Sequence, residues 1–247
     1  MKYFILNKIA FLFCLVSIIT SPCLASKEIS DFMYCMNQVK QMKSCMYDYT
    51  LLVNFEDGTK ESVKGQSYFD IPNQQVYNAN SEATIIYDGT WYYHANHDLK
   101  QVTIYKMEKR FRPQLADSMR NEIFQIGSFG LMIDSLVLKY GRVPAVQKHN
   151  NKIKFDILFI PNSYIKRISL EFDMKTNLLI KSEIEAYFSI ENYDDIQHKA
   201  TQTMTCTNYK RMPDKELTKM DSYFKVSANE KNITLLKYKN YKLITTK

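Results

Sequence analysis

The chain has 247 residues, of which 45% are hydrophobic and 24% are charged, and its formal net charge is +7. This length suffices for one domain with a substantial core. The positive charge is mild and comes from lysines scattered along the chain, so it argues against nucleic acid as a partner and leaves attraction to anionic lipid head groups open.

Residues 1–25 have the features of a cleavable export signal. Two lysines form a basic start, an apolar run follows over residues 9–20, and small residues precede a cleavage point after Ala25. The apolar run of 12 residues is too short to span a bilayer, which needs about 20. The alternative is a lipoprotein signal with Cys23 as the lipidated residue. We expect an exported single domain over residues 26–247.

Three cysteines remain after removal of this segment: Cys35, Cys45 and Cys206. An odd number allows one disulfide bond at most. Cys35 and Cys45 cannot pair across one straight helix, since ten residues at a rise of 1.5 Å separate their Cα atoms by about 15 Å. A Cys45–Cys206 bridge and three buried or free thiols both stay open.

Residues 27–44 are predicted to form an amphipathic helix. Apolar side chains recur every three or four positions, and Ser30 is a candidate cap with Asp31 in the first turn. The helix either packs on a sheet as ordinary core or covers a cavity as a lid. Its methionines favour the lid, because Met side chains adapt to varied apolar partners. The residues expected to face the cavity are Met36, Val39 and Met42.

A hairpin is predicted for residues 47–70 and an antiparallel meander for residues 65–106. Residues 47–56 alternate between apolar and polar side chains, and Asp57-Gly58 turns them into a hairpin with residues 60–70. Asp88-Gly89 stands between two runs rich in Tyr and Ile, which predicts a two-residue type I′ turn with Gly at positive φ.

Six features follow one another along this meander: Gly65, Pro72, Tyr77, Asp88-Gly89, Trp91-Tyr92-Tyr93, and Asp98-Leu99-Lys100-Gln101-Val102-Thr103. Their order and spacing resemble the periplasmic lipoprotein carrier family, LolA. The resemblance implies a mainly β fold with α: an unclosed antiparallel β-barrel of about 11 strands, with a helical lid over an apolar cavity that holds the acyl chains of a lipoprotein in transit. One departure is Ile71, where the family carries a basic residue that hydrogen-bonds the lid.

Four side chains of the meander are expected to line this cavity: Tyr77, Ile85, Trp91 and Tyr93. The alternative for Trp91 is an ordinary packed aromatic. The phase of the alternation is ambiguous in the Tyr-rich hairpin, so the pattern alone does not fix which residues face inward.

Residues 113–140 break the β pattern and are predicted to form two short helices around Gly127 and Gly130. They are either core packing or the second half of a mobile lid. The lid residues expected here are Met119, Ile123, Phe124 and Leu131.

After residue 152 the chain returns to strands. Residues 153–159, 168–172 and 178–188 alternate between apolar and polar side chains, which predicts a sheet with one wet and one dry face. Residues 198–209 are expected to form a polar, Thr-rich strand near an edge. Residues 232–246 are expected to form a C-terminal hairpin that turns at Lys239-Asn240, beyond the length that the family needs.

Catalytic signatures are scarce. The sequence has no nucleophile elbow, phosphate loop or dinucleotide fingerprint. His94 and His97 fall in a strand and a turn, where their spacing does not aim both rings at one metal ion. We expect no enzymatic activity, no cofactor and no metal.

The sequence therefore predicts a monomeric periplasmic carrier that binds lipoprotein acyl chains, or another lipid, and chaperones lipoproteins towards the outer membrane. An inner-membrane releasing complex and an outer-membrane receptor are the expected partners. The alternative is a lipid- or lipoprotein-binding sensor, or an envelope interaction module, on the same fold without transfer activity.

Overall fold

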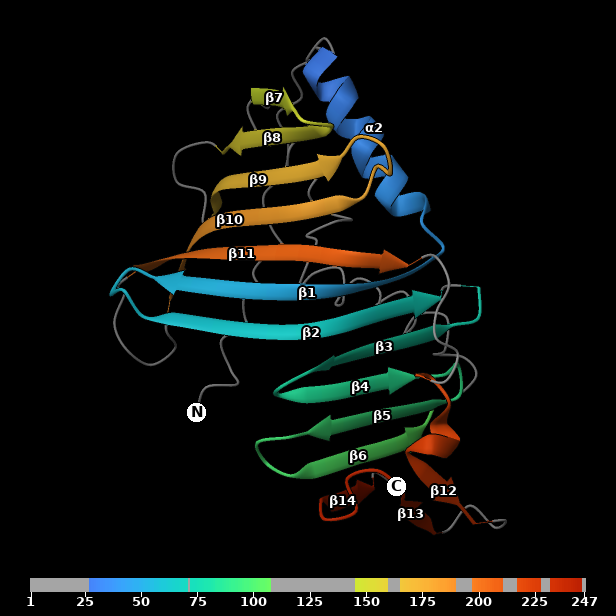
Figure 1. The fold of residues 1–247 in the computed structure, drawn as a ribbon. Coiled ribbons are helices and arrows are strands. Elements are labelled where there is room, and N and C mark those ends of the chain that lie inside the picture. The colour runs from blue at the N-terminus through green and yellow to red at the C-terminus, as the bar shows by residue number, and fades with distance from the viewer. Residues whose placement is uncertain are drawn as a thin grey trace, which may run out of the picture.

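The computed structural model describes residues 27–70, 72–107, 145–159, 165–189, 197–210, 217–227 and 232–245. In this part of the chain the helix α2 (Lys27–Gln41) lies beside one end of a 12-stranded sheet, and a small hairpin near the C-terminus lies at the other end (Figure 1). The predicted fold class is confirmed, since the described residues are mainly β, with an unclosed and mostly antiparallel sheet, one short α-helix and a small C-terminal hairpin.

The sheet has the strand order β14-β6-β5-β4-β3-β2-β1-β11-β10-β9-β8-β7. The bounds of the strands are β1 Ser44–Phe55, β2 Lys60–Asp70, β3 Gln75–Asn80, β4 Ala83–Tyr87, β5 Trp91–Asn96, β6 Gln101–Lys106, β7 Ala145–His149, β8 Lys152–Leu158, β9 Ile165–Asp173, β10 Leu179–Ser189, β11 Gln197–Lys210 and β14 Lys242–Thr245. The separate hairpin consists of β12 (Phe224–Val226) and β13 (Ile233–Leu235), preceded by a 3₁₀ turn, η2 (Met220–Ser222).

Tight turns join most neighbouring strands. Asp88, Gly89 and Thr90 lie between β4 and β5, and Gly89 has a φ of 90°. The predicted type I′ turn at Asp88-Gly89 is wrong, because that turn needs a positive φ at both residues and Asp88 does not have one. The Asp88 carboxylate accepts hydrogen bonds from the backbone N–H groups of Thr90 and Trp91, both at 2.8 Å, which fixes the loop.

One face of the sheet, here called the helix face, is apolar along most of the sheet. Cross-strand partners point to the same side, so the pairs Phe155–Leu170, Ser182–Met204, Leu51–Val63 and Cys45–Phe69 place their side chains together on this face. The apolar stripe of α2, with Phe32, Cys35, Met36 and Val39, packs on its β8–β10 part. Burial of this stripe explains why a helix of 15 residues is stable here.

The opposite face of the sheet is apolar only at the β1–β6 end. A continuous cross-strand row runs over six strands there: Met46, Tyr68, Tyr77, Ile86, Tyr93 and Ile104. The C-terminal segment covers this row with Met220, Tyr223 and Phe224, and β14 extends the sheet by pairing in parallel with β6. The two ends of the sheet are thus covered on different faces, by α2 and by the C-terminal segment.

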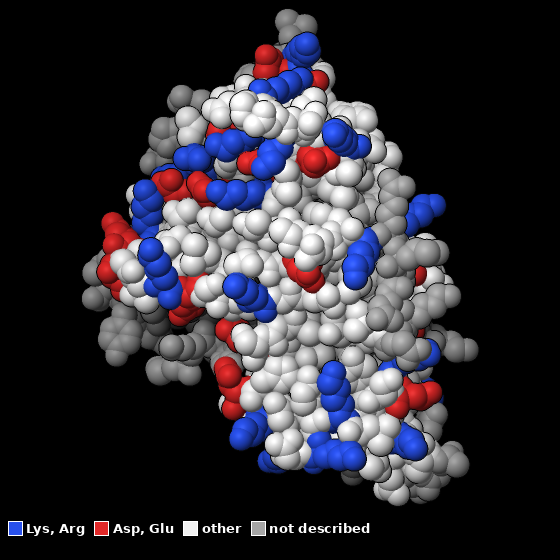
Figure 2. Space-filling model, viewed as in Figure 1, with Lys and Arg blue, Asp and Glu red and all other residues white. Residues whose placement is uncertain are grey.

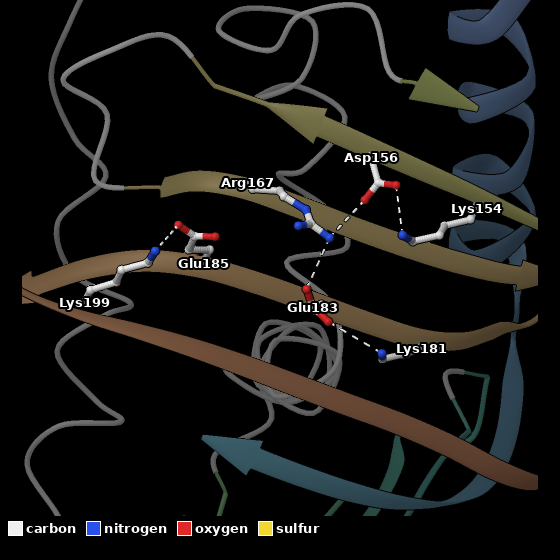
Figure 3. A network of polar contacts seen from close by, with 7 residues as sticks. All are labelled: Lys154, Asp156, Arg167, Lys181, Glu183, Glu185 and Lys199. Carbon is white, nitrogen blue, oxygen red and sulfur yellow. Dashed lines mark hydrogen bonds and ion pairs between the residues drawn. The ribbon is translucent and has the colours of Figure 1, made fainter. Parts of the chain in front are cut away.

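At the β8–β11 end, the opposite face is polar. Arg167 lies between Asp156 and Glu183, at 3.3 Å from each, and Lys154, Lys181, Glu185 and Lys199 extend the pattern (Figure 3). Figure 2 shows positive and negative side chains intermixed over this part of the surface. This is the solvent-exposed face that the alternation of residues 153–159, 168–172 and 178–188 predicts.

Tyr93 lies in the cross-strand row that the C-terminal segment covers. Its side chain is fully buried, and its hydroxyl has no hydrogen-bond partner among the described residues. Because a buried hydroxyl without a partner costs desolvation energy, we expect Tyr93→Phe to raise the free energy of unfolding by about 1 kcal/mol in urea titrations. Tyr49→Phe is the matched control, since Tyr49 Oη donates to Asn78 at 3.1 Å and should lose stability. A loss of stability in Tyr93→Phe contradicts the expectation.

Two predictions about individual elements are wrong. Residues 198–209 were expected near an edge, but β11 is central, between β1 and β10. Its threonines point to the wet face, while Met204 and Cys206 are buried on the helix face. Ser30 was expected as a helix cap, but α2 begins at Lys27, so Ser30 lies inside the helix.

The C-terminal hairpin exists at different residues from those predicted. Among the described residues 232–245, the strands β13 and β14 do not pair with each other. Instead, β13 pairs with β12 and β14 pairs with β6. The two helices predicted for residues 113–140 lie outside the described residues.

Candidate apolar site

A hollow between described residues lies where the C-terminal end of α2 approaches the helix face. Val39 and Met42 approach it from the helix side, and the sheet contributes side chains from β1, β2, β10 and β11. The lining consists of Val39, Met42, Cys45, Tyr47, Phe69, Leu179, Met204, Cys206 and Tyr209. Strand alternation accounts for the set, because Cys45 and Tyr47 on β1, and Met204 and Cys206 on β11, are two residues apart and share a face.

The polar atoms of this hollow are held in their neutral forms. Burial, reinforced by Cys206, raises the pKa of the Cys45 thiol to about 12, and burial raises the pKa of Cys206 to about 11. Burial also raises the pKa of Tyr47 and of Tyr209, and the Tyr209 hydroxyl donates a hydrogen bond to the Leu179 carbonyl. The thiolate is the reactive form of cysteine. Because both thiols are protonated at neutral pH, the site is apolar and its cysteines are unreactive.

The three cysteines of residues 26–247 are buried and unbridged. Of the two possibilities left open by the sequence, the structure therefore has three buried thiols. Cys45 and Cys206 face the same hollow, whereas Cys35 lies in the cluster between α2 and β8–β10.

The hollow is small, at about 20 Å³. It has room for about one water molecule, so an acyl chain does not fit in this arrangement. Val39 of α2 and Met42, which directly follows this helix, form the wall on the helix side, so a shift of α2 would enlarge the hollow. Figure 1 shows the connection from α2 to β1 as a short link beside the ends of the central strands, at the right of the view.

The predicted cavity residues of the first helix lie on the helix face. Met36 and Val39 are buried in the cluster that α2 forms with β8–β10, and Val39 also reaches the hollow. Met42 lines the hollow and is half-buried. Ile85 is half-buried on the same face, packed against the cluster that contains Cys45 and Phe69.

The other predicted meander residues, Tyr77, Trp91 and Tyr93, lie on the opposite face. Trp91 contacts Phe224 edge to face, at 5.6 Å between ring centroids, and the ring of Tyr93 lies parallel to that of Phe224 at 6.2 Å. The structure thus separates these three from Met36, Val39, Met42 and Ile85. Met119, Ile123, Phe124 and Leu131 lie outside the described residues.

Sequence reasoning missed seven of the nine lining residues: Cys45, Tyr47, Phe69, Leu179, Met204, Cys206 and Tyr209. Alternation on β1 and β11 identifies shared faces, but it does not say that residues 45–47 and 204–206 are neighbours. That information comes from the pairing of β1 with β11, which no local pattern encodes.

His97 has a structural role, because its ring connects two hydroxyl groups. One ring nitrogen lies 3.0 Å from the Thr84 hydroxyl and the other 3.2 Å from the Tyr241 hydroxyl, and burial lowers the pKa of His97. Within the described residues there is no cluster of three His, Cys, Asp or Glu side chains that could hold a metal. None of the described helices has the length and hydropathy that a membrane crossing requires.

No family model and no curated protein matches the chain. Similar solved structures include an uncharacterized conserved protein from Thermus thermophilus, with a TM-score of 0.40, 6% identity and coverage of 87% of this chain and 99% of that chain. A LolA superfamily protein from Nitrosomonas europaea has a TM-score of 0.33 and 11% identity, covering 76% of this chain and 97% of that chain. A domain named for outer membrane lipoprotein sorting, from Vibrio parahaemolyticus, has a TM-score of 0.29 and 9% identity, covering 79% of this chain and 97% of that chain.

Proposed function

We propose that this protein is a periplasmic carrier that shields lipoprotein acyl chains, or those of another lipid, between α2 and the helix face of the sheet. The observation that carries this proposal is the hollow at the end of α2. It is lined by aliphatic, aromatic, thioether and protonated thiol groups, with no charged side chain among its lining residues.

The gain from binding comes from removing methylene groups from water. Each buried CH₂ contributes about 0.8 kcal/mol, so a chain of about 16 carbons contributes roughly 12 kcal/mol. That is enough to offset the displacement of a short helix from part of its packing surface. Met42 and Met204 suit such a site, because thioether side chains repack around apolar partners of varied shape.

Transfer requires that loading and release be triggered by other components. An inner-membrane complex that hands over the lipoprotein and an outer-membrane receptor that accepts it are the partners that a carrier needs. Each has to shift the balance between the packed and the displaced position of α2, because a ligand or partner changes an equilibrium only through its different affinity for the two states.

A lipid-binding sensor without transfer activity is the second candidate. It is favoured by Ile71, which stands where the resembling family has a basic residue that hydrogen-bonds the lid. An aliphatic side chain cannot form that hydrogen bond. If α2 has no such latch, loading can occur without a controlled release step.

One experiment separates the two functions. The protein is purified from the periplasm, bound lipid or lipoprotein is identified by mass spectrometry, and the loaded protein is incubated with outer membranes. Co-purified lipoprotein that moves to the membranes supports the carrier, and bound lipid that stays supports the sensor. Protein without lipid in native preparations, and without uptake of added lipoprotein, contradicts both.

Met42 offers a direct test of the binding site. We expect Met42→Gln to weaken the uptake of an apolar fluorescent dye about tenfold, because it places an amide in the apolar lining of the hollow. Met174→Gln is the matched control, since Met174 is 46% exposed in the turn after β9 and should leave uptake unchanged. Trp91→Ala on the opposite face should also leave it unchanged, provided that circular dichroism shows an intact sheet. Equal losses in Met42→Gln and Met174→Gln contradict the assignment of the site.

A further inference from the structure

The positive charge of the protein is concentrated in its last residues. Residues 26–216 contain 24 Lys and Arg and 24 Asp and Glu, so they are neutral overall. Residues 217–247 contain seven lysines, two acids and no arginine, a formal charge of +5. In residues 26–216 the basic side chains are therefore matched by an equal number of acidic ones, whereas in residues 217–247 they are in excess.

The fold gathers these charges at one end of the molecule. Lys225 lies on β12, Lys237 and Lys239 lie in the turn before β14, and Lys242 begins β14. The backbone N–H of Lys242 donates to the carbonyl of Lys100 at 2.8 Å, which adds a fifth lysine from the turn between β5 and β6. These five exposed lysines, Lys100, Lys225, Lys237, Lys239 and Lys242, are here called the basic end. Figure 2 shows positive side chains along the bottom of the view, where β6 and the C-terminal elements lie.

The lysines of the other end behave differently. Lys152, Lys181 and Lys199 pair with Glu171, Glu183 and Glu185, at 2.7, 3.5 and 2.7 Å. Within the described residues, no lysine of the basic end has a carboxylate within ion-pair distance. Its charge is therefore available to an external anion.

Apolar and aromatic groups accompany the basic end. Leu99, next to Lys100, is 58% exposed at the tip of a tight turn. The Lys237 ammonium lies over the rings of Tyr223 and Tyr238, at 4.8 and 5.5 Å from their centroids, and Tyr241 stacks on Tyr238 at 5.0 Å. Tyr and Lys side chains with an exposed aliphatic tip are the combination found where proteins meet the head-group region of a bilayer.

We propose that the basic end docks the protein on the surface of an anionic phospholipid bilayer. All five cations are lysines, which act as compact point charges and suit a fluid layer of head groups, whereas recognition of defined carboxylates on a protein favours the planar fork of arginine. Docking here leaves α2, at the far end of the sheet, away from the membrane. The proposal goes beyond the carrier function and does not depend on it.

The test is binding to vesicles of phosphatidylcholine with and without phosphatidylglycerol. Residues 26–247 contain all described elements and are used so that the apolar run at residues 9–20 makes no contribution. We expect binding only to the anionic vesicles and a steep loss as salt is raised. Lys225→Gln, Lys239→Gln and Lys242→Gln combined should lower the partition coefficient about a hundredfold, at roughly fivefold for each lysine.

The matched control is the combined variant of Lys152→Gln, Lys181→Gln and Lys199→Gln. It removes the same charge from the ion-paired end and should bind the vesicles nearly as well as the unchanged protein. Equal losses in the two triple variants show an effect of net charge alone and overturn the proposal. Absence of binding to anionic vesicles at low salt overturns it too, even if the basic end captures an acidic protein.

Discussion

Phe155→Ala should lower the free energy of unfolding by about 4 kcal/mol, which would remove much of the stability of a typical domain. Phe155 is fully buried on β8, where it joins α2 to the sheet. Its ring meets Phe32 of α2 edge to face at 5.4 Å and Phe172 of β9 at 6.0 Å. Removal of the ring leaves a cavity between the helix and two strands, and these neighbours cannot all collapse into it.

Urea titrations followed by circular dichroism measure this change. Leu158→Ala is the control on the same strand, because Leu158 is 51% exposed and loses little burial on truncation. We expect it to cost less than about 1 kcal/mol. The opposite outcome is a difference of less than about 1 kcal/mol between the free energies of unfolding of Phe155→Ala and Leu158→Ala. In that case the contact between α2 and β8 contributes little to stability, and the packed position of the helix is not the dominant one.

Gly65→Ala should destabilise the protein by about 3 kcal/mol. Gly65 lies on β2 opposite Tyr49 of β1, and the Tyr49 ring covers the gap that the missing side chain leaves. A Cβ at this position would lie 2.6 Å from the Ala79 carbonyl oxygen and 2.6 Å from the Cζ and Oη atoms of Tyr49. The Ala79 oxygen belongs to the paired backbone of β3, so strands or ring have to move.

Gly58→Ala provides the comparison for this effect. Gly58 has a φ of 84°, but a Cβ there meets no atom within 4 Å, so its cost is backbone strain alone, at about 1 kcal/mol. A smaller loss in Gly65→Ala than in Gly58→Ala, measured by the same urea titrations, would mean that Tyr49 leaves its place over Gly65 without penalty.

The elements with local signals could be predicted from the sequence. The α2 helix, the hairpins around Gly58 and Gly89 and the alternating strands β8–β10 are where their patterns put them, because periodicity and turn residues act within about ten residues. The strand β7 was missed although a signal exists. Asn150 and Asn151 have φ values of 48° and 60° and form the two-residue turn from β7 into β8. Asparagine adopts positive φ readily, so an Asn-Asn pair is a hairpin signal of the same kind as Asp-Gly.

The faces of the sheet could not be predicted at the Tyr-rich end. Strands β3–β5 bury side chains on both faces, so Tyr77 and Tyr93 look no different in the sequence from Tyr87, which is buried on the helix face. Tyr77 and Tyr93 are buried on the opposite face because the C-terminal segment packs over them there. For the same reason the edge position expected for the Thr-rich residues 198–209 was wrong, since alternation shows that one face is wet but does not show how many neighbours a strand has.

The parallel pairing of β14 with β6 has a consequence for biosynthesis. Lys242 pairs with Gln101, so the two strands are separated by more than half of the chain. Until residues 217–245 have been translated, β6 lacks the strand that pairs with its free side among the described residues, and the aromatic row beside it lacks its cover. Nascent chains that stop before residue 217 therefore expose this strand and the aromatic row, and we expect proteases and holdase chaperones to bind them more often than chains that include residues 217–245.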